Sequence, residues 1–201
     1  MKVYRLTSSE SGKDGFAILR PSNKQNIKEV DLLNVWWDDW GSGGDKIGDF
    51  VFCYGVNVCK ATVFKTLKEN FKELNSIDLK YNKTEKEINA KNPKRLKWLP
   101  KEEVPLKAFF SPKNFDCLPQ STITTNDRGM IRFDGIAELR GDLIIPREEN
   151  KGIFFSSKTI EGFDFFTLTN SGHLLCTERV KQFCEKSNYK NIIFLEVGEI
   201  I

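Results

Sequence analysis

The stretch VWWDDW, residues 35–40, brings together residue types that bind other proteins. It holds three of the four tryptophans of the chain and two adjacent aspartates, and the glycine-rich run GSGGD follows it. Tryptophan side chains are frequent anchors at the centre of protein interfaces, and carboxylates there can pair with a basic partner surface. We therefore predict a partner-binding surface that consists of Trp36, Trp37, Asp38, Asp39, Trp40 and Asp45.

Two other interpretations of this stretch are open. In a helix, Trp36 and Trp40 would be four positions apart and would both face the core, while Asp38 and Asp39 would face water. The three carboxylates around the glycines, with Asp45 as the third, could also hold a divalent cation. The segment lacks the regular ligand spacing and the closing glutamate of a calcium loop, so we expect no metal.

His173 is the only histidine in the chain and could serve as a base for Cys176, three residues later. In a strand, residues i and i+3 point to opposite faces, so we expect a structural histidine instead. The sequence contains no GxSxG, HExxH, GxxxxGKS or GxGxxG motif. We predict a binding protein without catalytic residues or cofactors, and keep an enzyme of unfamiliar type as an alternative.

The five cysteines form no CxxC pair, and their number is odd. This pattern argues against a disulfide framework and against a structural zinc site. We expect the thiols to be small buried apolar groups. The adjacent acids Glu102–Glu103 and Glu148–Glu149 are expected to be solvated.

The net charge of +3 is unevenly distributed over the 201 residues. Residues 60–114 carry 14 basic and 7 acidic side chains, whereas both flanks are mildly acidic. Residues 82–103 are highly charged, which predicts an exposed insertion within a single domain of residues 1–201, with Trp98 packed back onto the body. Basic residues around a tryptophan can also bind nucleic acid through the basic region 60–114, but no nucleic-acid-binding motif is present.

Apolar patterns predict both strands and helices. Phe64, Leu67, Phe71 and Leu74 form one stripe with helical spacing, which predicts a helix over residues 60–74. A second helix is expected after Thr177, a good N-cap residue. Residues 28–37 are compatible with either a short helix or a strand. Strands are predicted at residues 2–6, 15–21, 49–55, 152–157, 163–169, 173–177 and 191–197.

The strands of the second half are separated by short turns, such as NSG at residues 170–172. Short turns suit antiparallel hairpins, because parallel crossovers need a dozen or more residues. The predicted fold is therefore α+β, with a largely antiparallel sheet and a few packed helices. No apolar run approaches the ~20 residues needed to span a bilayer, and the first residues lack the apolar core of a secretion signal. We expect a cytoplasmic protein without a membrane segment.

Residues 150–197 resemble the C-terminal region of a family of bacterial immunity proteins from polymorphic toxin systems. In that family a strand leads to Ser or Thr followed by an acid, which opens a helix, and a final strand closes the chain. Thr177-Glu178 match the cap, Val180 and Phe183 match the apolar helix face, and Ile193-Phe194 match the last strand. The opening VYRL is also similar, whereas Lys190-Asn191 replace the usual glycine before the last strand.

The resemblance implies a small α+β protein that has no catalytic site and neutralises a cognate toxin in the cytoplasm of its own cell. From the residues themselves, VWWDDW is the best contact surface for such a toxin. A nucleic-acid-associated protein remains the second hypothesis. The oligomeric state is left open.

Overall fold

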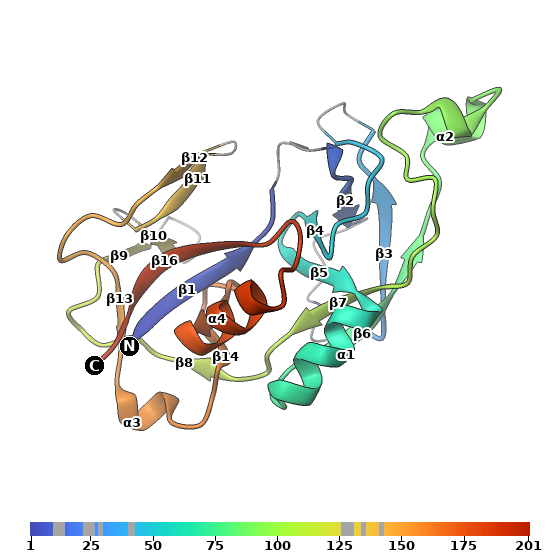
Figure 1. Ribbon diagram of the computed structural model, residues 1–201. Coiled ribbons are helices and arrows are strands. Elements are labelled where there is room, and N and C mark those ends of the chain that lie inside the picture. The colour runs from blue at the N-terminus through green and yellow to red at the C-terminus, as the bar shows by residue number, and fades with distance from the viewer. Residues whose placement is uncertain are drawn as a thin grey trace.

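The computed structural model describes residues 1–9, 15–21, 27, 30–39, 43–125, 131–133, 136–140 and 143–201. Their strands form a six-stranded sheet and a closed barrel (Figure 1). The barrel strands all lie between the first two sheet strands in chain order, so the barrel is an insertion into the sheet.

The sheet strands are β1 (Lys2–Thr7), β8 (Asn114–Phe115), β13 (Ile153–Phe155), β14 (Phe165–Leu168), β15 (Leu174–Thr177) and β16 (Ile193–Ile200). Their order is β13–β16–β1–β15–β14–β8. The central strand β1 pairs antiparallel with both β15 and β16. The two edge strands, β13 and β8, are short and pair in the parallel sense.

The barrel strands are β2 (Ile18–Pro21), β3 (Leu32–Trp37), β4 (Phe50–Cys53), β5 (Val56–Lys60), β6 (Asn75–Tyr81) and β7 (Leu106–Phe110). They close in the order β2–β3–β6–β7–β5–β4. Alternate residues of each strand point inward, and these fill the barrel with an apolar cluster. That cluster includes Leu19, Leu33, Val35, Val51, Cys53, Val58, Leu106 and Ala108.

Two hairpins and several short helices complete the described chain. The hairpins pair β9 (Ile123–Thr125) with β10 (Ile131–Phe133), and β11 (Glu138–Arg140) with β12 (Leu143–Ile145). The helices are α1 (Ala61–Asn70), α2 (Glu85–Asn89), the 3-10 turn η2 (Pro93–Arg95), α3 (Ser157–Ile160) and α4 (Glu178–Lys186). None of the helices in the described ranges is long and apolar enough to cross a membrane.

Helix α1 confirms the predicted apolar stripe, because Leu67, Phe71 and Leu74 are all buried. The helix itself ends at Asn70, earlier than predicted. At its end, the ammonium of Lys68 donates hydrogen bonds of 2.6 and 2.5 Å to the carbonyls of Lys72 and Leu74. The ammonium of Lys68 thus provides hydrogen bonds for two backbone carbonyls that follow the C-terminus of the helix.

One core cluster joins the barrel to the sheet. It combines Tyr4 from β1, Phe50 and Phe109 from the outer face of the barrel, Leu67 from α1 and Val180 from α4. Polar contacts cross the same junction: the side-chain amide of Asn191 donates to the carbonyl of Phe50 at 2.9 Å. The barrel is therefore docked on the sheet through both apolar and polar contacts.

The α+β prediction is confirmed, whereas the sheet and the barrel are mixed rather than largely antiparallel. The predicted antiparallel hairpin around residues 170–172 is present as β14–β15. Parallel pairs occur at β2–β4, β3–β6, β13–β16 and β14–β8. Parallel pairing requires a long connection, and β3 reaches β6 only after β4, β5 and α1. The local sequence pattern of a short strand does not indicate which distant strand it pairs with.

Residues 82–103 form an arm that carries α2 away from the barrel (Figure 1). Most side chains of the arm are exposed, but Trp98 is only 9% exposed and packs inward. Thr84 and Glu87 form a reciprocal capping box at the start of α2, which stabilises this short helix locally. Whether residues 1–201 behave as a single domain stays a prediction.

Candidate functional site

Trp36 and Trp37 lie on opposite faces of β3, because adjacent residues of a strand alternate. Trp37 packs against the apolar cluster inside the barrel and stacks on Tyr81, with ring centroids 5.7 Å apart. Trp36 lies on the outer face, opposite Arg20 of β2, and is half-buried. The helical interpretation of this stretch is therefore wrong for residues 32–37.

The carboxylate of Asp38 is buried and belongs to an ion pair inside the molecule. Asp38 is 1% exposed, and its Oδ1 lies 2.9 Å from Nε of Arg20. The hydrogen bond with Asp38 raises the pKa of Arg20 above its ordinary value. The guanidinium of Arg20 also lies over the ring of Tyr54, 4.6 Å from its centroid. We call Arg20, Trp36, Asp38 and Tyr54 the Arg20 cluster.

The other two predicted carboxylates bind lysines of the arm. The ammonium of Lys86 lies 3.6 Å from Oδ2 of Asp39 and donates to the backbone carbonyl of the same residue at 2.8 Å. Lys101 contacts Asp45 at 2.6 Å, and the hydrogen bond from Lys101 lowers the pKa of Asp45. Asp39 and Asp45 therefore connect the arm to the barrel.

The structure thus rearranges the predicted contact surface. Asp38 is removed from it, because a buried carboxylate in an ion pair cannot reach a partner. Asp39 and Asp45 face the arm rather than open solvent, and Trp37 completes the barrel interior. Trp36 and Trp37 are both half-buried, but only Trp36 lies on the outer face of the barrel, and Trp40 lies outside the described residues.

Two residues of the site were missed from the sequence. Arg20 lies opposite Trp36 because β2 and β3 pair antiparallel. No local sequence pattern reveals this pairing. Tyr54 occupies the tight turn between β4 and β5 and is 40% exposed. The predicted strand at residues 49–55 ran through this turn, although a glycine after a large aromatic side chain was a usable signal for an exposed turn.

His173 lines a cleft of about 290 Å³ between the sheet and the β4–β5 hairpin, and Tyr54 of the Arg20 cluster belongs to the same wall. Burial, with a further contribution from the charge of Arg5, lowers the pKa of His173 to about 4. The imidazole is therefore neutral at pH 7. Cys176 is fully buried and is not part of the cleft wall, so the structure does not bring the two residues together as a dyad.

Four of the five cysteines are buried thiols, as expected. Burial raises the pKa of Cys53 and of Cys184 to about 12, and it also raises the pKa values of Cys59 and Cys176. Protonated thiols of this kind are poor nucleophiles. Within the part of the chain that the structure describes, no three His, Cys, Asp or Glu side chains are placed to hold a metal ion.

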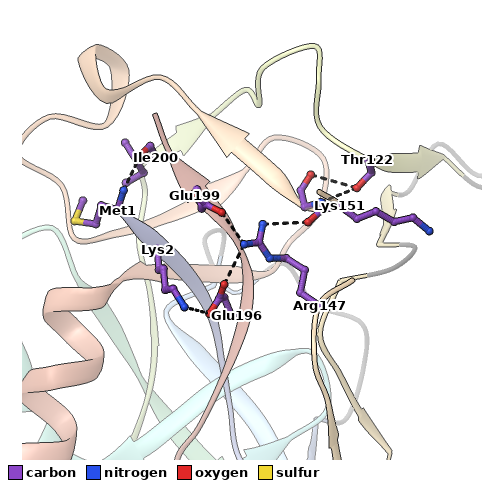
Figure 2. Close-up of polar contacts among 9 residues, drawn as sticks. Met1, Lys2, Thr122, Arg147, Lys151, Glu196, Glu199 and Ile200 are labelled. Atoms are coloured by element: carbon purple, nitrogen blue, oxygen red, sulfur yellow. Dashed lines mark hydrogen bonds and ion pairs between the residues drawn. The ribbon is translucent and has the colours of Figure 1, made fainter. Parts of the chain in front are cut away.

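The densest charge network lies at the other end of the sheet (Figure 2). Nη2 of Arg147 lies 3.0 Å from Glu196 and 2.6 Å from Glu199, both on β16. Lys2 of β1 contacts Glu196 at 2.6 Å, and Arg147 donates to the carbonyl of Lys151 at 3.0 Å. This network ties the segment after β12 to the adjacent strands β1 and β16, which is a structural role.

The Arg20 cluster offers aromatic faces and an oriented guanidinium on a barrel wall. These groups suit recognition of another molecule, since Trp, Tyr and Arg dominate the binding energy of protein interfaces. The adjacent acids Glu102–Glu103 and Glu148–Glu149 are exposed, as predicted. When the chain is compared with models of known protein families and with curated proteins, nothing matches it.

Proposed function

We propose that this chain is an immunity protein, which binds the toxin domain of a cognate bacterial toxin in the cytoplasm and neutralises it by protein–protein contact. The observation that carries the proposal is the Arg20 cluster. Its accessible groups, Trp36, Arg20 and Tyr54, belong to the three residue types most enriched at the centres of interfaces.

The cluster is also rigid, which reduces the entropy lost on binding. Arg20 is held by the buried carboxylate of Asp38 on one side and by the ring of Tyr54 on the other. The supporting strands belong to a closed barrel, which has no free strand edge. Contact with a partner on this wall is therefore made by side chains rather than by added strands.

The charges near the cluster favour an acidic partner surface instead of the basic cleft expected from VWWDDW. Asp38, Asp39 and Asp45 are all paired within the chain. Four bases of the arm between residues 91 and 97 are exposed, and none of them pairs with an acid among the described residues. These bases are Lys91, Lys94, Arg95 and Lys97.

Co-expression with a toxin encoded beside this chain tests the proposal. Wild-type protein should keep the cells alive and should co-purify with the toxin domain. The double substitution Trp36→Ala and Tyr54→Ala should lose both effects while the thermal midpoint stays close to the wild-type value. Leu143→Ala, an equally apolar change on the exposed β12, is the control and should keep protection.

Two outcomes count against the proposal in different ways. If the wild-type chain fails to protect cells or to bind the toxin, the immunity function is wrong. If the double variant protects as well as Leu143→Ala does, the function stands but the Arg20 cluster is not the interface.

The four unpaired bases also support a second candidate, binding to nucleic acid. Trp98 beside them is buried, so this contact would rest on phosphates and not on base stacking. Four phosphate contacts predict that affinity falls about 150-fold between 50 and 200 mM salt. Fluorescence anisotropy with labelled DNA and RNA measures this slope. Absence of binding at 50 mM salt would remove this candidate.

A further inference from the structure

The arm is fixed to the barrel on either side of its outer part. Lys86 binds a barrel aspartate at the first attachment, and Lys101 binds another at the second. Trp98, which is buried, adds an apolar attachment next to the second one. Residues 88–97 lie between these attachments, so they are presented away from the barrel on a supported frame (Figure 1).

The backbone of this outer part is ordered by local hydrogen bonds. The side chain of Asn92 accepts a hydrogen bond of 3.2 Å from the backbone N–H of Lys94, and Pro93 opens the short turn η2. The backbone N–H of Leu96 closes that turn on the carbonyl of Pro93 at 3.0 Å. Side chains on an ordered turn lose less conformational freedom on binding than side chains on a flexible linker do.

The same part of the arm has a concentrated positive charge. Residues 88–98 contain four bases and no acid. The four side chains are exposed, and none of them forms an ion pair with an acid among the described residues. We call them the arm bases, and they are Lys91, Lys94, Arg95 and Lys97. Like charges so close together repel one another, and a partner surface of opposite charge would relieve this repulsion.

The observations favour a protein over a nucleic acid as the partner of this surface. Single-stranded nucleic acids stack their bases on accessible aromatic rings, whereas Trp98 of the arm is buried. Ile88 of α2 is instead 67% exposed, and an apolar side chain of this kind suits a protein contact. Outside residues 60–114 the chain carries 17 bases and 21 acids, so a long phosphate backbone would meet repulsion beyond the arm.

We propose that Ile88 and the arm bases form a second contact surface of this chain, which binds an acidic face of the toxin domain. This inference rests on the proposed function and adds a surface that the Arg20 cluster does not include. The two surfaces are connected, because Lys86 of the arm contacts Asp39, which follows Asp38 of the cluster. The arm bases attract the acidic face before the two proteins touch, so they act mainly on the rate of association.

Binding kinetics with the toxin domain encoded beside this chain test the arm bases. At about 50 mM salt, the double reversal Lys94→Glu and Arg95→Glu should lower the association rate constant about tenfold and change the dissociation rate constant little. The difference from wild type should shrink toward about 500 mM salt, where exposed charges are screened. Lys158→Glu with Lys186→Glu, on the exposed faces of α3 and α4, makes the same change in net charge and is the control. Thermal midpoints of both double variants should stay close to the wild-type value.

Ile88→Ala tests the apolar part of the surface. This change should raise the dissociation rate constant about fivefold, because it removes apolar area that is buried only in the complex. Leu143→Ala, at another exposed aliphatic side chain, is the matched control and should dissociate like wild type. Equal dissociation rates of Ile88→Ala and Leu143→Ala would contradict the role of Ile88 in the contact.

The results that would overturn the proposal can be told apart. If the Lys94→Glu and Arg95→Glu variant associates as fast as its control at low salt, the arm is not a contact surface, although binding by the wild-type chain leaves the proposed function intact. If that variant instead loses affinity for labelled DNA or RNA while its association with the toxin domain is unchanged, the arm binds nucleic acid. If the wild-type chain does not bind the toxin domain, the proposed function fails and this inference fails with it.

Discussion

The buried carboxylate of Asp38 lies 2.9 Å from Nε of Arg20, whereas the neighbouring Asp39 meets Lys86 at 3.6 Å near the surface. Two adjacent and identical side chains therefore contribute differently to stability. Breaking a buried ion pair leaves an uncompensated charge, so Asp38→Ala should lower the free energy of unfolding by about 3 kcal/mol. Asp39→Ala should cost less, because the side chain of Lys86 is 59% exposed and is solvated when its partner is removed.

Urea unfolding followed by tryptophan fluorescence and by circular dichroism measures both changes. The double substitution Asp38→Ala and Arg20→Ala removes both charges and should be less destabilising than the sum of the single changes. Equal effects of Asp38→Ala and Asp39→Ala would contradict the burial of Asp38.

Trp37 should contribute more to stability than Trp36, although the two are adjacent. Trp37 packs inside the barrel and stacks on Tyr81, while Trp36 is on the outer wall. Trp37→Ala should cost somewhat less than about 3–5 kcal/mol, the cost for a fully buried aromatic side chain, because Trp37 is half-buried. Trp36→Ala should cost much less and should act mainly on partner binding. A double-mutant cycle of Trp37→Ala with Tyr81→Ala should give a coupling of about 1 kcal/mol, and additive effects would argue against the stack.

The elements with strong local patterns were predicted from the sequence, because their periodicity depends only on nearby residues. Helix α4 after Thr177 and the helical stripe from Phe64 to Leu74 are examples. Strand β6 alternates Ile77 and Leu79 with charged neighbours, but this period-2 pattern is short and was not recognised. The barrel was missed for a different reason, because its closure depends on pairs between distant strands.

The candidate site was also predicted only as far as local sequence patterns allow. The aromatic and acidic residues of VWWDDW were visible, but their partners were not. Whether Asp38 binds a partner or a buried arginine is decided by the register between β2 and β3, which places Arg20 opposite Trp36. The burial of four of the five cysteines was predictable, because it follows from their apolar neighbours in the chain.

Cys117 should be the only thiol that reacts quickly in the native protein. The other cysteines are buried, and burial raises the pKa of each of them. Ellman's reagent at pH 8 should therefore detect one fast thiol, and five after unfolding in guanidinium. The fast reaction should vanish in Cys117→Ser. Two or more fast thiols in the wild-type protein would show that the core around these cysteines opens readily.

The network of Arg147 should make the protein sensitive to acid below pH 4.5. Burial by itself would raise the pKa of Glu196, but the hydrogen bond from Lys2 and the charges of Lys2 and Arg147 outweigh it and lower that pKa. A carboxyl group with a lowered pKa in the folded state stabilises the fold fully above its ordinary pKa. This stabilisation is lost as the pH falls through the folded-state pKa.

Thermal midpoints between pH 3 and pH 7 measure the contribution of this network. Arg147→Gln should lower the midpoint most at pH 6–7, where Glu196 is ionised, and the difference from wild type should shrink toward pH 3. Arg140→Gln, which removes the exposed pair with Glu138, should lower the midpoint little at any pH. A difference between Arg147→Gln and wild type that stays constant from pH 7 to pH 3 would show that Arg147 acts through packing rather than through its charge.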